Sequence, residues 1–456
     1  MSAPLAAPLL VPPRPVPPRA PLSPLKMAFT LGRNVLSVWG EESYRREIVS
    51  SPFFGVTSFT LNDPEAIRHV FVDNHEAYVR TSITRRMLKP MLGRGLFLAE
   101  GEDWRHQRRA LAPAFTPRAM DPLRPLMTRI AQERLDQLAR RTGRPIDLFE
   151  QTQRLTLEIA GRTMFSMEMT DRAERMRALV DGYAARVGPS VFDLVLPANM
   201  PNPTDLRRGM AANRFKAFIE EMIAERAAAG PAPDVARDLC DLLLAARDPR
   251  DGSPFDKEML RDQVSTMILA GHETTAVALF WTLLLLSLSP GHQEEAAAEA
   301  VAWSGDDGTP LPAQLPVIHA VASEAMRLYP PAFLVTRVAT KPDRIGAHAV
   351  SPGDMINVSP WLLHRQERLW ADPHAFDPRR FMPGAPPIDR LVYLPFGIGP
   401  RICIGAHFAT TELVLVLAEW LKRFRVERTD DRPVMPVGTV TLRPDHLARF
   451  RLHARM

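Results

Sequence analysis

The stretch Phe396-Gly-Ile-Gly-Pro-Arg-Ile-Cys-Ile-Gly405 carries one of the two cysteines in a chain of 456 residues. Its three glycines remove side chains around Cys403 and allow backbone angles that other residues avoid, so the chain can curl about the sulfur and direct amide N–H groups at it. Arg401 adds a cation two residues away, which favours the thiolate over the thiol. The stretch therefore predicts a loop that presents one sulfur ligand to a metal, followed by a helix that starts near Ala406.

Two simpler interpretations of this loop are alternatives to a metal ligand. A free cysteine often packs as a small hydrophobic residue, so Cys403 could be a structural cysteine in a glycine-rich turn. Gly397 and Gly399 also look like the start of a dinucleotide-binding fingerprint, but the third glycine is missing and no strand–helix–strand unit follows. Motifs elsewhere in the chain are needed to decide.

The composition indicates the class of protein. Hydrophobic residues at 46% and charged residues at 24% are typical of a soluble globular protein. Two cysteines exclude a disulfide framework and an iron–sulfur cluster within the chain, and they fit a reducing compartment, so we expect a cytoplasmic protein. The net charge of +5 is too small to indicate nucleic-acid binding.

The N-terminal residues 1–25 contain nine prolines, which favour neither helix nor sheet, so we expect an extended, mobile tail before a single domain over residues 26–456. The tail has no apolar run of about 20 residues and lacks the pattern of a signal peptide, so we expect no membrane anchor. The longest apolar run, residues 276–288, is too short to cross a bilayer.

The predicted secondary structure is mostly helical. A long helix is expected to start at Ser253-Pro254 and to run to Leu288, and its apolar second half should be buried. Many helices with a few short strands predict a mainly α (α+β) fold. Further helices are expected over residues 102–111, most of 118–228 and 316–328, and strands over 56–61 and parts of 336–358.

The long helix contains the sequence Ala270-Gly-His-Glu-Thr-Thr275. A glycine inside a helix costs about 1 kcal/mol relative to alanine, so we interpret Ala270 and Gly271 as leaving space where a flat cofactor or dioxygen can approach. Thr274 can bond a carbonyl of its own helix and open the hydrogen-bond ladder, and Glu273 can relay protons from solvent. The simpler alternative is a threonine pair in mid-helix beside an exposed glutamate.

Residues 396–405 resemble the haem-binding signature of the cytochrome P-450 family at every fixed position, and the resemblance spans about residues 40–456 with five ordered motifs. It implies the cytochrome P-450 fold, a helix-rich triangular prism with small β-sheets. Haem b (iron protoporphyrin IX) would lie between the long central helix and the cysteine loop. Cys403 would be the proximal thiolate and metal ligand, and Phe396 would pack near the sulfur.

The resemblance also implies how the haem propionates are bound. Arg401 would pair with one propionate, and the Trp-x-x-x-Arg element makes Trp104 and Arg108 ligands as well. An indole N–H and a guanidinium one turn apart on one helix face are donors suited to a carboxylate. Arg337 would be a further propionate-binding arginine. The alternative for Arg108 and Arg337 is a solvated arginine on the surface.

Other matching residues are assigned structural roles. Glu324 and Arg327 resemble the Glu-x-x-Arg element of the family, with Arg380 as the partner, and together they would fix the backbone of the cysteine loop. His272 and His407 are interpreted as packed or solvent-facing histidines, because a second iron ligand would block the position that dioxygen needs.

The activity implied by the resemblance is monooxygenation: one oxygen atom of dioxygen enters a small apolar substrate, fatty-acid-like or terpenoid-like. Thr274 would hold the hydrogen-bond network around dioxygen, and Glu273 would be the acid of the proton relay. Because the chain has no flavin or iron–sulfur segment, a separate ferredoxin and an NAD(P)H-dependent reductase would supply the electrons. The enzyme is expected to be a monomer.

The resemblance places the substrate pocket against residues 81–97, 267–274 and 332–335. Two rival functions stay open. A haem-thiolate enzyme that uses or rearranges peroxide should lack the Glu273–Thr274 pair, and a haem-based sensor would gain nothing from a proton relay.

Overall fold

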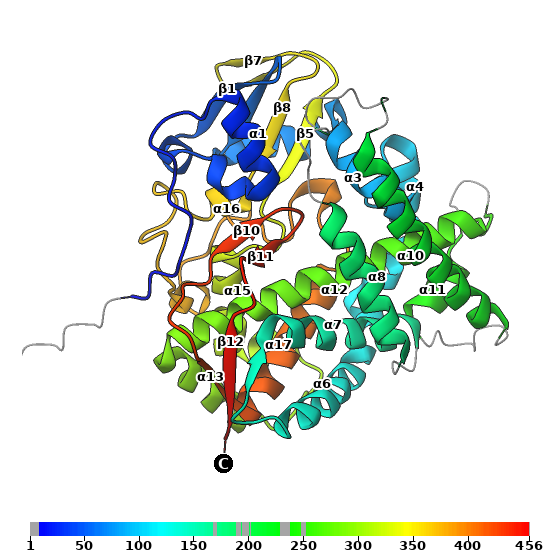
Figure 1. Cartoon of the computed structure of the whole chain (residues 1–456), viewed down its shortest axis with the longest axis vertical. Helices are drawn as coiled ribbons and strands as arrows, with labels where there is room; N and C mark the ends of the chain where they lie inside the picture. Colours follow the sequence, from blue (N-terminus) through cyan, green and yellow to red (C-terminus); the bar gives the residue numbers. More distant parts are fainter. Residues whose placement is uncertain are drawn as a thin grey trace, which may run out of the picture.

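The computed structural model describes residues 9–166, 171–187, 193, 200, 202–228, 238–247 and 252–455. The chain forms a body of helices with small sheets beside it (Figure 1). The helices are α1 (Pro24–Arg33), α2 (Pro64–Arg68), α3 (Ser82–Leu92), α4 (Gly101–Leu111), α5 (Pro117–Met120), α6 (Arg124–Ala139), α7 (Leu148–Phe165), α8 (Asp171–Val187), α10 (Pro203–Ala228), α11 (Leu239–Ala245), α12 (Lys257–Leu288), α13 (Pro290–Ala302), α14 (Leu311–Gln314), α15 (Pro316–Leu328), α16 (Pro360–Leu363) and α17 (Ala406–Arg423). The strands are β1 (Ile48–Phe53), β2 (Val56–Leu61), β3 (Tyr78–Arg80), β4 (Pro145–Asp147), β5 (Val335–Ala339), β6 (Asp343–Ile345), β7 (His348–Val350), β8 (Met355–Val358), β9 (Phe424–Arg428), β10 (Pro436–Gly438), β11 (Leu442–Pro444) and β12 (Arg449–Ala454).

The helix α12 crosses the middle of the helical body (Figure 1). It begins at Lys257 and not at Ser253-Pro254 as expected, because Asp256 is its N-cap and accepts a hydrogen bond from the Met259 N–H. It ends at Leu288, as predicted.

By length and composition α12 could cross a membrane, the one described helix of which this is true, whereas the apolar run alone had seemed too short. However, 78% of its most apolar window is buried inside the structure, which is typical of the core helix of a soluble protein.

The largest sheet has five strands in the order β1-β2-β8-β5-β3. Only the β2–β8 pair is parallel. Strand β2 follows its predicted bounds, and Asp63 caps the next helix by accepting from the Ala66 N–H. A smaller hydrophobic cluster lies between this sheet and the segments that cover it, while the larger cluster runs through the helices.

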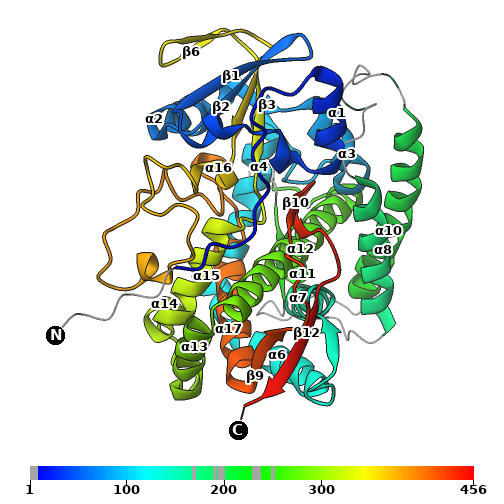
Figure 2. The same ribbon diagram turned by 60° about the vertical axis from the view of Figure 1, so that its left-hand side comes forward.

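The C-terminal hairpin of β10 and β11 lies beside α12 (Figure 2). The Trp281 indole N–H donates to the Leu442 carbonyl at 2.7 Å, so the hairpin is fixed to the buried half of the helix. This contact brings residues from the end of the chain next to the segment around Glu273.

The proline-rich segment is anchored where the structure describes it, over residues 9–23. The Leu10 carbonyl accepts from the Phe376 N–H at 2.8 Å, and the Pro13 carbonyl accepts from the Tyr329 hydroxyl at 2.7 Å. The segment is extended, but these contacts hold it against the folded chain, which corrects the expected mobility for residues 9–23. Residues 1–8 lie outside the described residues.

Candidate functional site

The cysteine loop is shaped by glycines with left-handed backbone angles. Gly397 and Gly399 have φ of +75° and +72°, a region that favours glycine. A Cβ on Gly399 would also lie 2.1 Å from the Phe71 carbonyl oxygen, so no side chain fits there. The Cys403 N–H donates to the Phe396 carbonyl at 2.9 Å and closes the loop. Helix α17 then begins at Ala406, as predicted.

Cys403 is exposed, yet the atoms around it raise the pKa of its thiol by desolvation. A hydrogen bond from the Gly405 backbone and the positive charge of Arg108 act in the opposite direction. The cation that acts on the sulfur is therefore Arg108 and not Arg401, which corrects the sequence-based interpretation. Because desolvation disfavours the thiolate, a positive partner such as a metal ion would stabilise it.

The predicted brace behind the loop is present; Glu324 and Arg327 are fully buried, and Arg380 is 15% exposed. Both Glu324 carboxylate oxygens accept from Arg327 at 2.7 Å, and Arg380 approaches the same carboxylate at 3.5 Å. The remaining Arg327 donors bond the carbonyls of His364, Pro373 and Ala375 at 2.7–2.8 Å. Arg327 therefore ties α15 to the irregular segment before the cysteine loop.

A second arginine cluster lies beside the loop, at the end of strands β3 and β5. Arg80 and Arg337 are direct cross-strand partners, and Arg401 donates to the Ala99 carbonyl at 2.9 Å while its guanidinium stacks on Trp104 at 4.4 Å. Burial, together with the charges of Arg80 and Arg401, lowers the pKa of Arg337 to about 9. Burial and Arg80 lower the pKa of Arg401 to about 10.

This cluster fits a dianionic cofactor. Glu100 pairs with Arg80 and with Arg401, while Arg337 makes no ion pair with any described residue. Its one hydrogen bond goes to the Thr336 carbonyl at 3.0 Å. Partly buried cations with so little compensation favour a bound anion, and the two propionates of the expected haem would supply it. Among the predicted propionate ligands, the structure brings together Trp104, Arg337 and Arg401.

Arg108 stands apart from the other predicted propionate ligands. Burial lowers the pKa of Arg108, and Cys403 is the one charge that opposes this shift. It lies one turn from Trp104 on α4, as predicted, but its neighbour is the cysteine sulfur and not the guanidinium cluster. Phe396 packs against the large hydrophobic cluster beside the loop.

The middle of α12 shows two different faces. Ala270 is exposed and Thr274 is half-buried, although the residues around them are buried. The Thr274 hydroxyl donates to the Ala270 carbonyl at 2.6 Å, the predicted bond to its own helix, and α12 continues through this position. Gly271 behaves differently from expectation, because its missing side chain makes room for Met164 of α7, whose Cε lies 3.2 Å from a built Cβ. Within the sequence from Ala270 to Thr275, Ala270 is the exposed residue.

Glu273 lies on a buried face of α12 and not on an exposed one. Its Oε1 accepts from the Thr441 hydroxyl at 2.8 Å and from Arg443 at 2.7 Å. Burial opposes ionisation, but Arg443, His272 and Thr441 keep the pKa of Glu273 below its usual value. Glu273 is therefore a carboxylate, and Arg443, whose side chain is 29% exposed, connects it to the surface.

The histidines take the roles expected of them. His272 is buried without a hydrogen-bond partner for either ring nitrogen among the described residues, and burial lowers its pKa to about 4. It is a neutral packed side chain. His407 instead pairs with Asp121 at 2.7 Å.

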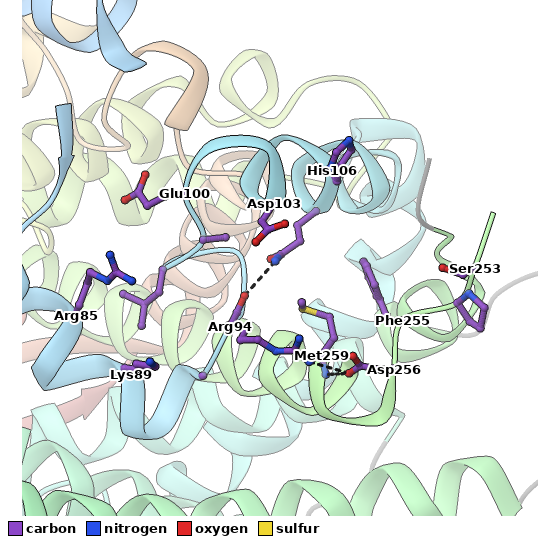
Figure 3. Close-up of a pocket in the computed structure, with 15 residues that line it drawn as sticks. Arg85, Lys89, Arg94, Glu100, Asp103, His106, Ser253, Phe255, Asp256 and Met259 are labelled. Carbon is purple, nitrogen blue, oxygen red and sulfur yellow. Dashed lines mark hydrogen bonds and ion pairs between the residues drawn. The ribbon is translucent and has the colours of Figure 1, made fainter. Parts of the chain in front are cut away.

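A cavity of about 530 Å³ lies between α3, α4 and the start of α12 (Figure 3). Figure 3 shows Arg85 and Glu100 at one end, and Ser253 and Phe255 at the other. Its lining includes none of the predicted haem or oxygen residues, and it reaches the arginine cluster through Ala99 and Glu100.

Sequence reasoning missed Arg80, Glu100, Thr441 and Arg443. Arg80 sits in a three-residue strand, too short to give a periodic signal, and Glu100 precedes the Trp-x-x-x-Arg element by a few residues without a pattern of its own. Thr441 and Arg443 are about 170 residues from Glu273, a pairing that needs the hairpin to be placed first.

The family model described as Cytochrome P450 matches residues 34–448. Cyclooctatin synthase of Streptomyces melanosporofaciens is 33% identical over 83% of this chain and 83% of its own length. Cyclooctat-9-en-7-ol 5-monooxygenase of the same organism is 32% identical over 80% of this chain and 79% of its own. The crystal structure of a cytochrome P450, CYP102L1, has a TM-score of 0.76 at 26% identity and covers 90% of this chain and 96% of that one.

Proposed function

The chain belongs to the cytochrome P450 family and is a cytochrome P450 monooxygenase, and from this premise we propose that it hydroxylates an apolar, terpenoid-like substrate at a haem held by Cys403. The observation that carries the proposal is one sulfur ligand in a rigid glycine loop beside an undercompensated arginine cluster. The P450 enzymes use dioxygen, an apolar substrate and redox partners. We propose a ferredoxin and its reductase as those partners.

The cofactor site is assigned residue by residue. Cys403 would be the iron ligand, and Arg337, Arg401 and Trp104 would hold the propionates of haem b. When bound, the haem supplies the oxygen chemistry, with cleavage of the O–O bond favoured by electron donation from a thiolate ligand. Arg108 stabilises the thiolate form of Cys403 by its charge.

The residues of α12 would manage protons. The Thr274 hydroxyl lies at the open face of the helix and can exchange its bond to the Ala270 carbonyl for one to a ligand beside it. Glu273, ionised on the adjacent face, can accept a proton from solvent through the partly exposed Arg443 side of the helix. Glu273 and Thr274 fit a monooxygenase that uses dioxygen better than a peroxide-using enzyme or a haem-based sensor, because peroxide chemistry and sensing need no proton delivery.

The substrate class follows from the relatives and from the lining of the open space. Both Streptomyces relatives carry names that refer to cyclooctatin or to an alcohol of its hydrocarbon skeleton. In this chain the expected pocket segments expose the apolar residues Phe97, at 41%, Ala270 and Ala332. They also expose Arg85, Lys89 and Arg94, which line the cavity between α3, α4 and α12. The small and aromatic apolar residues among them suit a compact hydrocarbon ring system.

A binding and turnover experiment tests the substrate class. Purified protein would be titrated with a cyclic terpenoid alcohol and, separately, with a long-chain fatty acid, and the Soret band would be followed. A surrogate ferredoxin and reductase with NADPH would then supply electrons for product analysis. We expect the alcohol to shift the band and to be hydroxylated. Product formed with peroxide alone, or from the fatty acid alone, would contradict the proposal.

The ligand and the proton residue are tested by variants. Cys403→His should abolish the thiolate-type spectrum of the ferrous carbon monoxide complex, and a variant that keeps it would refute the ligand. Thr274→Ala should lower product formed per NADPH about a hundredfold, the low end of the range typical of one proton-transfer group. The matched control is Thr282→Ala, since Thr282 makes the same bond to its own helix at 2.7 Å but is fully buried. An equal yield of product per NADPH in the two variants would remove Thr274 from the mechanism.

A further inference from the structure

Two arginines stand directly opposite each other in the sheet beside the cysteine loop. Arg80 of β3 and Arg337 of β5 are register partners in an antiparallel pair. Like charges in this position repel each other and destabilise the pairing. Arg80 is buried and Arg337 is half-buried, so solvent screens the repulsion only in part and a negative charge nearby relieves it.

Glu100 supplies part of that charge from an unusual position. It is the N-cap residue of α4, yet its side chain makes no capping hydrogen bond. Its Oε1 instead accepts from the Arg80 backbone N–H at 3.2 Å and from the Arg80 guanidinium at 3.1 Å. Its Oε2 pairs with Arg401. One carboxylate therefore links a strand and the cysteine loop at the expense of its own helix cap.

The charges of this cluster leave a defined excess. Arg80, Arg337 and Arg401 are three cations, Glu100 is one anion, and the excess is two positive charges. Haem carries two propionates, so the loaded site would be balanced. Without Glu100 the same site would keep one uncompensated positive charge near the porphyrin.

We propose that Glu100 fixes the charge excess of this arginine cluster at two and thereby lowers the reduction potential of the haem iron. The proposal rests on the proposed function, since it requires a bound haem. Its physical basis is that a negative charge near the porphyrin disfavours the extra electron of the reduced state. Glu100 acts through Arg80 and Arg401, so it is a positioning residue.

The surroundings of Glu100 limit the size of this effect. Its side chain is 22% exposed and lines one end of the cavity between α3, α4 and α12 (Figure 3). Solvent and ions in that cavity screen part of the charge. The effect should therefore be moderate, about a tenfold change in the equilibrium constant of one-electron reduction, which corresponds to about 59 mV.

The test measures the reduction potential of the haem-loaded protein by spectroelectrochemical titration. Glu100→Gln, which keeps the size of the side chain, should raise the reduction equilibrium constant about tenfold, and Arg80→Gln should lower it by a similar factor. The double variant should return close to the wild-type potential, because the excess of two charges is restored. A residue that merely supports the fold would not give opposite and cancelling shifts.

The control is Glu102→Gln, which removes a negative charge two residues away on the same helix. Glu102 is exposed and pairs with Arg105, outside the cluster, so the potential should not change. A Glu100→Gln potential equal to that of this control overturns the proposal. Should Glu100→Gln retain no haem, an unchanged potential in Arg80→Gln overturns it instead. A wild-type chain without a thiolate-type spectrum would overturn the proposed function itself, which distinguishes the two failures.

Discussion

Two buried arginine clusters flank the cysteine loop, and they differ in how completely their charges are compensated. Arg327 gives two hydrogen bonds to Glu324 and three more to backbone carbonyls, so its guanidinium is fully used. Arg337 bonds one backbone carbonyl and makes no ion pair with a described residue.

This difference separates a structural cluster from a binding site. A buried charge with all its partners inside the protein holds the chain together, and the removal of one partner leaves the other uncompensated. A buried charge with missing partners costs stability until a ligand supplies them. The Glu324–Arg327 brace is of the first kind, and the cluster around Arg337 is of the second.

The largest expected effect is the loss of the brace. Arg327→Lys removes the bidentate pair with Glu324 and cannot reach all three carbonyls, because an ammonium group lacks the planar fork of a guanidinium. Breaking a buried, hydrogen-bonded charge pair costs about 3–5 kcal/mol. We expect a drop of this size in the unfolding free energy, measured by denaturant titration, together with poor haem incorporation.

Arg380→Lys is the control for this prediction, because it should lower the unfolding free energy by a smaller amount. Arg380 approaches Glu324 only at 3.5 Å and otherwise bonds the Asp372 carbonyl at 3.2 Å. Its replacement should therefore cost clearly less than that of Arg327. Equal losses for the two variants would show that the brace does not depend on the bidentate geometry.

A smaller and different effect is expected in the undercompensated cluster. Arg337→Gln removes a cation that makes no ion pair with a described residue, so the unfolding free energy of the haem-free protein should not fall. Haem, however, should dissociate about tenfold faster, which corresponds to about 1.4 kcal/mol of binding free energy. The measurement is the rate of haem transfer to an excess of an apoglobin acceptor.

Arg344→Gln is the control for haem retention. Arg344 is exposed on β6 and bonds the Gly346 carbonyl, away from the cluster. It should transfer haem at the wild-type rate. An Arg337→Gln protein that loses haem no faster than this control but unfolds more easily would reverse the assignment and make Arg337 a structural residue.

The sequence predicted those parts of the site that depend on local pattern. The cysteine loop, the helix from Ala406 and the Glu324–Arg327 pair are each encoded within a few neighbouring residues, and the structure has all three. The partners of Glu273 could not be found in this way, because Arg443 comes from a hairpin whose position depends on the packing of α12. The prediction that Gly271 leaves space for a cofactor or dioxygen was wrong for the same reason, since its neighbour Met164 belongs to another helix.

A buried acid on α17 is the counterpart of Arg337, because it too lacks a partner of opposite charge in the described part of the chain. Glu412 of α17 is fully buried, and no cation among the described residues pairs with it. Desolvation raises its pKa well above the usual value, and the neighbouring Thr275 hydroxyl only partly offsets the shift. An acid without a cation inside the protein avoids the cost of its charge by keeping its proton.

The retained proton makes stability depend on pH in a predictable direction. Above the unfolded pKa of about 4.3 the folded state binds one more proton than the unfolded state, so the unfolding free energy falls as the pH rises towards the folded pKa. Glu412→Gln removes this dependence and keeps the shape. Its stability relative to wild type should therefore increase between about pH 5 and pH 8, by at most about 1.4 kcal/mol per pH unit. Urea unfolding of both proteins across this range measures the difference, which cancels the opposite contribution of buried histidines such as His272. A constant difference would mean that Glu412 is ionised in the folded protein and has a cationic partner.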